Sequence, residues 1–186
     1  MEQNIKGGKL SNTKISPLIC SFYGGPGIGK TTAAASLYAA LKKTNISVEL
    51  AAEFAKEKVL EKNKMAMSYQ KYIWVNQAYR IYCASQTAQV VITDAPILLG
   101  CIYNKPLTQS LMDVIFDEHT QYNHLNIVLT RNHTHFDDTS RAHDLEESKN
   151  IDLQIRTLLD EHEIPFIEYD SYNEDELVQL ILESIS

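Results

Sequence analysis

The stretch GGPGIGKTT at residues 24–32 concentrates residue types that bind phosphate. It fits the spacing G-x-x-x-x-G-K-[ST], with Gly24, Gly29, Lys30 and Thr31 at the defining positions. Glycines let the backbone curl, so that successive N–H groups and a following helix N-terminus face one point. Lys30 would then reach the β- and γ-phosphates of a nucleotide, and the Thr31 hydroxyl would ligate Mg²⁺. We therefore expect ATP and Mg²⁺ to bind at Gly25, Pro26, Gly27, Ile28, Gly29, Lys30, Thr31 and Thr32.

Asp94 is the expected partner of this loop. It ends the apolar run VVITD, which predicts a buried strand. An aspartate at such a strand end orders the Mg²⁺ shell in P-loop proteins, so Thr31 and Asp94 are the expected metal-ligating residues. The alternative is that Asp94 caps a helix or a turn.

Glu53 and two arginines complete the expected catalytic set, with Lys30 and Asp94. Glu53 follows the predicted strand in VELAAEF, where it could accept the proton of an acceptor hydroxyl; the alternative is a solvated glutamate at a helix start. The polar loop at residues 130–144 supplies Arg131 and Arg141. Such a loop is typical of a kinase lid, whose arginines neutralise transition-state charge, although both could be ordinary surface arginines. For the histidines and aspartates of this loop, a solvated segment is favoured over a metal site.

The charges are unevenly distributed along the chain. Residues 1–80 hold twelve Lys or Arg against five acids, whereas residues 81–186 hold five against nineteen. Basic residues gather between the second and third predicted strands, the acceptor side of P-loop kinases, and aromatic residues lie among them. Cations hold phosphates while bases stack on aromatic rings, so a nucleic-acid acceptor is plausible. We expect Tyr72, Tyr79 and Tyr82 to lie in the core and Trp74 to be exposed. The expected acceptor-binding residues are Lys56, Lys58, Lys62, Lys64, Trp74 and Arg80.

The elements expected to position these residues alternate between strands and helices. Apolar runs predict strands at residues 17–23, 46–51, 89–96, 125–130 and 165–169. Helical patterns occupy residues 30–43, 54–62, 68–86, 107–118, 144–162 and 173 to near the end. This order predicts an α/β fold with a five-stranded, mainly parallel sheet sandwiched by helices. We expect a flexible tail at residues 1–15 and a single kinase domain at residues 16–186.

Other classes of protein fit the sequence less well. There is no apolar run of about 20 residues to span a bilayer and no signal-peptide core, so an intracellular, cytoplasmic protein is expected. Cys20, Cys83 and Cys101 form no metal-binding pattern, which predicts reduced and mostly buried thiols. The nearest match to a guanine-reading Asn-Lys-x-Asp segment is NKPL at residues 104–107, which lacks the aspartate. Sensor and arginine-finger segments of a motor are not recognisable either.

Several segments resemble a family of phage-encoded P-loop kinases. They are GGPGIGKTTAAASLYAALK, VELAAEFAKE, QAYRIY, VVITDAPILLGCIY and the lid that precedes IDLQIRTLLDEHEIPF. The resemblance spans nearly all of residues 17–170, with the lid the most divergent part. Some members are 5-hydroxymethyluracil DNA kinases, and their fold resembles that of thymidylate and deoxynucleoside kinases.

This resemblance implies ATP-dependent phosphorylation of a hydroxyl, with 5-hydroxymethyluracil in phage DNA as the favoured acceptor in thymidine hypermodification. It would place the protein in the host cytoplasm. A small nucleoside or nucleotide kinase and a polynucleotide-end kinase are the alternative enzymes, and a nucleotide-dependent switch ATPase is the alternative from another class. The expected partners are hydroxymethylated DNA or a small nucleoside or nucleotide, with no membrane and with a homodimer left open.

Overall fold

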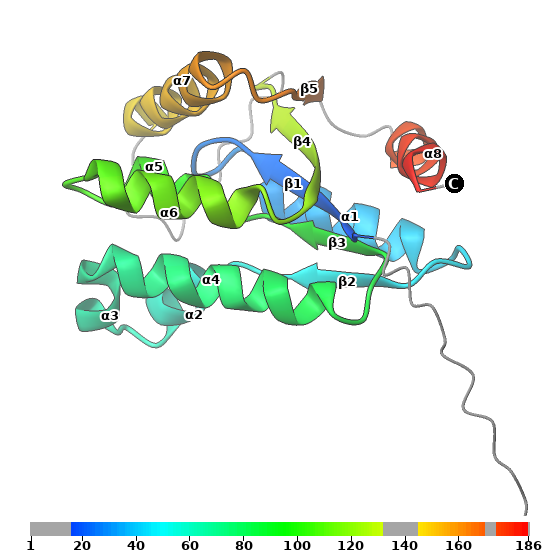
Figure 1. Cartoon of the computed structure of the whole chain (residues 1–186), viewed down its shortest axis with the longest axis horizontal. Helices are drawn as coiled ribbons and strands as arrows, with labels where there is room; N and C mark the ends of the chain where they lie inside the picture. The colour runs from blue at the N-terminus through cyan, green and yellow to red at the C-terminus, as the bar shows by residue number, and fades with distance from the viewer. Residues whose placement is uncertain (1–15, 132–144, 170–173, 186) are drawn as a thin grey trace, which may run out of the picture.

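Five parallel strands form the centre of the molecule in the computed structural model, which describes residues 16–131, 145–169 and 174–185 (Figure 1). The strands lie in the order β2-β3-β1-β4-β5, and each neighbouring pair is parallel. Their bounds are β1 Leu18–Tyr23, β2 Val48–Ala51, β3 Val90–Thr93, β4 Asn123–Leu129 and β5 Ile167–Tyr169. The predicted α/β fold and its five strands are confirmed, and the described sheet is parallel throughout.

Helices connect successive strands, and one more helix follows the last strand. They are α1 Lys30–Leu41, α2 Phe54–Leu60, α3 Lys64–Ser68, α4 Gln70–Ser85, α5 Leu99–Tyr103, α6 Gln109–His119, α7 Leu145–Glu161 and α8 Glu174–Ser184. The sequence did not predict α3 and α5, because five residues are too few to show a helical period. The Asn63 side chain begins α3 by accepting a hydrogen bond from the Ala66 amide.

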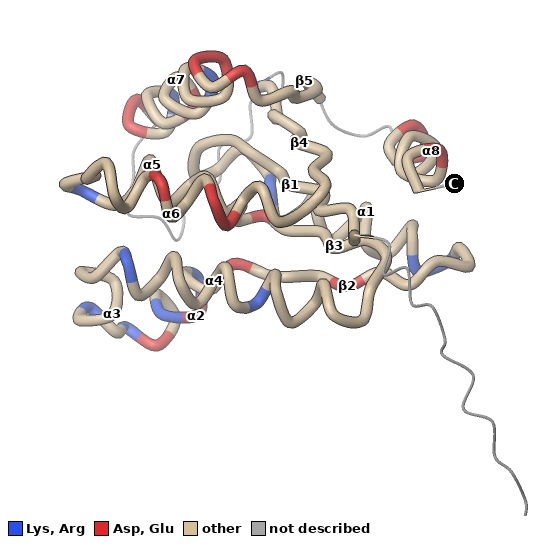
Figure 2. The backbone as a smooth tube through the Cα atoms, viewed as in Figure 1, with Lys and Arg blue, Asp and Glu red and all other residues tan. Residues whose placement is uncertain are grey.

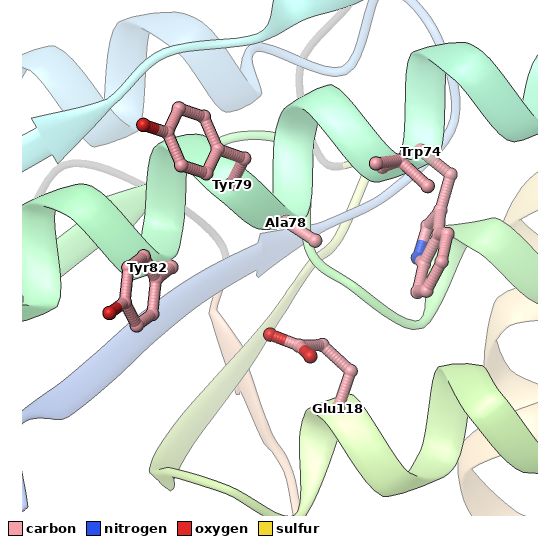
Figure 3. A pocket seen from close by; sticks show the side chains of 6 residues that line it. Trp74, Ala78, Tyr79, Tyr82 and Glu118 are labelled. Carbon is pink, nitrogen blue, oxygen red and sulfur yellow. The ribbon is translucent and has the colours of Figure 1, made fainter.

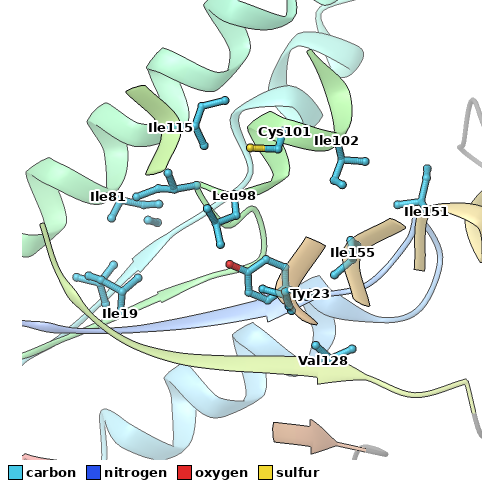
Figure 4. Packing of buried hydrophobic residues seen from close by; sticks show 14 of the residues in the cluster. Ile19, Tyr23, Ile81, Leu98, Cys101, Ile102, Ile115, Val128, Ile151 and Ile155 are labelled. Carbon is cyan, nitrogen blue, oxygen red and sulfur yellow. The ribbon is translucent and has the colours of Figure 1, made fainter. Parts of the chain in front are cut away.

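The sheet separates two hydrophobic clusters, because successive side chains of a strand point to opposite faces. In β1, Ile19 and Tyr23 enter one cluster, while Cys20 and Phe22 enter the other. The first cluster is closed by residues of α4, α5, α6 and α7, and Figure 4 shows Ile81, Cys101, Ile115 and Ile155 converging on Tyr23. The second is closed by α1 and α8, where the predicted apolar face of Ala34, Leu37 and Leu41 is buried. Helices therefore cover both faces of the sheet.

The sheet register brings the polar segments to one edge. Thr93 pairs with Ser21 of β1 and with Ala51 of β2, so the carboxyl ends of these strands lie together. The phosphate-binding loop follows β1, Glu53 follows β2 and Asp94 follows β3. The chain leaves β1 toward β2 and β3 on one side and later adds β4 and β5 on the other. Ligands of open α/β sheets bind at such a switch point.

Candidate functional site

The loop between β1 and α1 has the backbone shape that phosphate binding requires. Gly27 and Gly29 have φ angles of 86° and 100°, in the left-handed region that favours glycine. The Lys30 Nζ atom donates to the carbonyl oxygens of Gly24 at 2.7 Å and Gly25 at 3.0 Å. The ammonium group is thus folded back over the loop, beside the N-terminus of α1, which Lys30 begins. The loop and the helix N-terminus together form an anion-binding cradle.

Thr31 and Asp94 meet beside this cradle. The Thr31 hydroxyl donates to Asp94 Oδ2 at 2.6 Å. Asp94 is only 3% exposed, and its other carboxylate oxygen, Oδ1, is buried with no hydrogen-bond partner within the described part of the chain. A buried carboxylate oxygen without a partner is unfavourable, so this pair fits a hard cation such as Mg²⁺, which prefers oxygen ligands.

Glu53 lies at the same edge, at the N-cap position of α2, and is half-buried. Glu53 is close enough to Tyr103, on α5, to affect the pKa of that phenol. Burial raises the pKa of Tyr103 to about 12, with further contributions from the negative charges of Glu53 and Asp152. Glu53 and Asp152 therefore both lie near the Tyr103 phenol.

Arg131 is brought to the phosphate-binding loop by α7. Its Nε atom donates to Asp152 Oδ2 at 2.5 Å, and its terminal nitrogen donates to the Ser148 hydroxyl. Asp152 Oδ1 in turn accepts from the Gly25 amide at 2.5 Å, and Ser148 donates to the Pro26 carbonyl at 2.5 Å. The structure thus brings together Lys30, Thr31, Asp94 and Arg131. Arg141 and the histidines and aspartates at residues 133–143 lie outside the described residues.

The predicted acceptor residues are only partly available as positive charges. Lys58 Nζ lies 2.9 Å from Glu57 and 2.7 Å from Glu61, and Arg80 also pairs with Glu57. Hydrogen bonds to Glu61 and Glu57 raise the pKa of Lys58, so it stays charged but neutralised by its partners. Lys56, Lys62 and Lys64 are exposed on α2, α3 and the turn between them, where Figure 2 shows basic segments gathered at one end of the molecule.

The predicted exposure of the aromatic residues of α4 was wrong: the tyrosines expected in the core are exposed, and the tryptophan expected to be exposed is partly buried. Trp74 is partly buried against the core and donates from Nε1 to the Ile97 carbonyl at 3.0 Å. Tyr72, Tyr79 and Tyr82 are exposed by 42%, 62% and 49%. The reason is the orientation of α4, whose buried face is formed by other residues, namely Ile73, Gln77, Ala78, Ile81 and Ser85. Spacing alone did not reveal which of the two faces would meet the sheet.

A groove of about 290 Å³ lies along this exposed face, between α4 and α6. Figure 3 shows Trp74, Tyr79 and Tyr82 of α4 opposite Glu118 of α6. No residue of the phosphate-binding loop lines it. Cys83, on the same helix, is exposed, which corrects the expectation of mostly buried thiols for this residue, while Cys20 and Cys101 are buried as expected.

Sequence reasoning missed three residues of the site: Tyr103, Ser148 and Asp152. Ser148 and Asp152 are spaced i, i+4 on α7, and Ser148 is fully buried beside the apolar positions Ile151 and Ile155. A serine and an aspartate that interrupt the apolar face of a predicted helix were the available signal. Tyr103 gave no comparable signal, because its helix was not predicted.

Comparison with known proteins agrees with this geometry. A family model described as an AAA domain, AAA_28, matches residues 19–175. No curated protein sequence matches the chain.

Two solved structures share the fold. One is a NadR protein in complex with NR, at 15% identity and a TM-score of 0.70, covering 90% of this chain and 51% of that one. The present chain therefore spans about half the length of the NadR chain. The other is thymidylate kinase from Ehrlichia chaffeensis, at 14% identity and a TM-score of 0.57, covering 92% of this chain and 99% of that one. The fold is thus that of a P-loop NTPase of the nucleotide-kinase type. Within the described residues, no helix has the length and apolar character to cross a membrane.

Proposed function

This chain belongs to the AAA domain family AAA_28, and we propose that it is a P-loop kinase that transfers the γ-phosphate of ATP to a hydroxyl group of a nucleoside or nucleotide. The observation that carries the proposal is the contact of Thr31 with Asp94, at 2.6 Å, where the other Asp94 oxygen is buried with no hydrogen-bond partner among the described residues. A phosphate cradle next to oxygen ligands for a cation suits a nucleoside triphosphate held with Mg²⁺.

Each residue of the site has a distinct part in the proposed reaction. The loop amides and the Lys30 ammonium bind the phosphates, and Thr31 and Asp94 hold the metal ion. Mg²⁺, when bound, neutralises charge that develops on the phosphate oxygens. Glu53 accepts the proton of the attacking hydroxyl, and Arg131 stabilises the charge of the transferred group.

A small acceptor is favoured over a polyanion. Lys58 and Arg80, two of the cations on the acceptor side, are already paired with Glu57 and Glu61. The net charge of −7 opposes nucleic-acid binding further. The structurally similar proteins described above, a NadR protein in complex with NR and a thymidylate kinase, support the same class of acceptor.

The test is a transfer assay with γ-labelled ATP and a panel of acceptors: neutral and charged nucleosides, nucleoside monophosphates, plain DNA, 5′-hydroxyl oligonucleotides and hydroxymethyluracil DNA. We expect label on a nucleoside or nucleotide. Release of inorganic phosphate alone, whatever the acceptor, would favour the switch ATPase instead.

DNA carrying a hydroxymethylated pyrimidine is the second candidate acceptor. One observation favours it: Tyr69 and Tyr72, at 61% and 42% exposed, stand beside exposed Lys62, Lys64 and Lys71. Exposed aromatic rings among cations are typical of surfaces that bind single-stranded nucleic acid.

Salt dependence separates the two acceptors. DNA held by these cations should lose affinity with a log–log slope of about −0.7 to −0.9 per phosphate contacted. Replacing Lys56, Lys62 and Lys64 by alanine should flatten that slope. The control replaces Lys42 and Lys43, directly after α1, and Lys149, on α7, by alanine, and it should leave the slope unchanged. If DNA does not bind at low salt, the nucleic-acid candidate is ruled out.

A further inference from the structure

Asp152 joins two parts of the site with one carboxylate. Its Oδ1 atom accepts from the Gly25 amide and its Oδ2 atom accepts from Arg131 Nε, both at 2.5 Å. Gly25 lies in the first half of the phosphate-binding loop, and Arg131 follows β4 at the same edge of the sheet. The carboxylate thus fixes the separation between the loop backbone and the guanidinium group.

Ser148, one turn earlier on α7, makes a second hydrogen-bonded connection between Arg131 and the phosphate-binding loop. Its hydroxyl accepts from the Arg131 terminal nitrogen and donates to the Pro26 carbonyl. The approach is so close that a Cβ atom on Gly25 would lie 2.3 Å from the Ser148 carbonyl oxygen and 2.6 Å from its hydroxyl. Gly25 is therefore needed for packing against α7, in addition to the loop conformation.

We propose, on the basis of the kinase function proposed above, that Asp152 is a positioning residue that aligns Arg131 with the phosphate-binding loop for phosphoryl transfer. A guanidinium group carries five N–H donors, and Asp152 and Ser148 use two of them. Three donors remain for phosphate oxygens. Because Asp152 neutralises Arg131, the pair adds little net charge to the ground-state nucleotide site, and its effect is on the orientation of the arginine.

Asp152→Asn separates orientation from binding. In the wild-type chain Gly25 and Arg131 donate to different carboxylate oxygens, whereas an amide has one acceptor oxygen and places an NH₂ group at the other position, opposite one of these donors. Misplacing a catalytic group by about 1 Å can cost on the order of 10²-fold in rate. We expect kcat to fall about 10- to 100-fold on that scale, while the affinity for ATP stays within about threefold. Asp152→Glu, which keeps two acceptor oxygens, should recover part of the rate. Asp160→Asn, an exposed carboxylate farther along α7, is the matched control.

A double-mutant cycle shows whether Asp152 acts through Arg131. If it does, Asp152→Asn should lower kcat little further in an Arg131→Ala background, because coupled residues are non-additive. Free guanidinium should partly rescue Arg131→Ala only when Asp152 is present. Additive losses, a wild-type kcat in Asp152→Asn or an equal loss in Asp160→Asn would overturn the proposal.

Amide hydrogen exchange at Gly25 tests the contact itself, with no need for turnover. We expect faster exchange of the Gly25 amide in Asp152→Ala than in the wild-type chain. Urea unfolding of both proteins shows whether a change in global stability accounts for the difference in exchange. Unchanged exchange would overturn the positioning role of Asp152. If the wild-type chain transfers no phosphate but Gly25 exchange responds as expected, it is the kinase function that fails, and the Asp152 contact stands.

Discussion

Asp94 is the residue on which the site depends most, because it is buried, charged and satisfied on only one of its two oxygens within the described chain. Thr31, Lys30 and Arg131 all lie around the same cradle and offer, respectively, an oxygen ligand and two cations. Glu53 differs from them, since its proposed part is proton transfer and not phosphate binding. Single substitutions should therefore divide into those that affect binding and those that affect turnover.

Glu53→Gln should affect turnover and not ATP binding. Loss of a general base usually lowers turnover by about 10²–10⁴-fold, and the amide preserves the size of the side chain. ATP affinity should hardly change, because the proposed part of Glu53 is to accept a proton and not to bind phosphate. Glu49→Gln, an exposed glutamate on β2, is the control in steady-state kinetics. A wild-type kcat in Glu53→Gln would remove this residue from the mechanism.

Among the elements, α4 holds the acceptor side in place through one buried polar residue. Gln77 is 6% exposed; its Oε1 accepts from the Phe54 amide at 2.8 Å, and its Nε2 donates to the Ala51 carbonyl at 3.3 Å. It thereby connects α4 to the end of β2 and the start of α2, which flank Glu53.

Gln77→Ala should destabilise the fold by about 1–3 kcal/mol, the usual penalty when a buried donor, here the Phe54 amide, loses its hydrogen-bond acceptor. Urea unfolding measures the change. Asn76→Ala, on the next position of α4 with only an exposed bond to the Tyr72 carbonyl, should change stability by less than about 0.5 kcal/mol. Equal effects of the two substitutions would show that Gln77 is not a structural link.

The strands and the long helices were predictable from the sequence because their signals are local. Buried parallel strands appear as continuous apolar runs, as in LICSFY, and the glycine spacing places the phosphate-binding loop without further information. The orientation of α4 was not predictable. Tyr72, Tyr79 and Tyr82 share a helical face, but whether that face meets the sheet depends on the competing face formed by Ile73, Gln77 and Ile81.

The contacts of α7 were also beyond sequence reasoning. Asp152 and Gly25 are 127 positions apart, and a hydrogen bond between them follows from the tertiary packing of α7 on the loop. The sequence predicted Lys58 and Arg80 as acceptor-binding cations, but it did not predict their ion pairs with Glu57. The pair of Arg80 with Glu57 depends on how α2 packs against α4. The residue types were thus visible in advance, while their partners were not.

Within the described residues, a stacked histidine pair, with His119 buried and His124 partly buried, links stability to pH. His119 ends α6 and His124 lies in β4, with ring centroids 3.6 Å apart. Burial, followed by the charge of His124, lowers the pKa of His119 to about 3. Burial also lowers the pKa of His124, against a hydrogen bond to the His119 carbonyl that raises it. Both groups are therefore neutral in the folded chain at neutral pH.

Stability should consequently fall on the acid side. The unfolded chain binds protons at an ordinary histidine pKa of about 6.5, whereas the folded chain resists protonation. For His119, this contribution to the free energy of unfolding is complete above about pH 6.5 and is lost as the pH falls toward its folded pKa of about 3, by up to about 1.4 kcal/mol per pH unit. The lowered pKa of His124 acts in the same direction. His119→Asn should make this slope shallower in urea unfolding at several pH values. His162→Asn is the control, and identical slopes in both variants would contradict the assignment.

The carboxyl edge of the sheet brings together the phosphate-binding loop, Thr31 and Asp94, and we propose that they form one site for a nucleotide with Mg²⁺. Calorimetric titration of ATP, with and without Mg²⁺, tests it most directly in the wild-type chain and in Asp94→Asn. We predict that Mg²⁺ strengthens ATP binding in the wild-type chain and that Asp94→Asn removes most of this gain while the fold survives. Equal strengthening by Mg²⁺ in both proteins would contradict the claim and leave Asp94 as a structural cap.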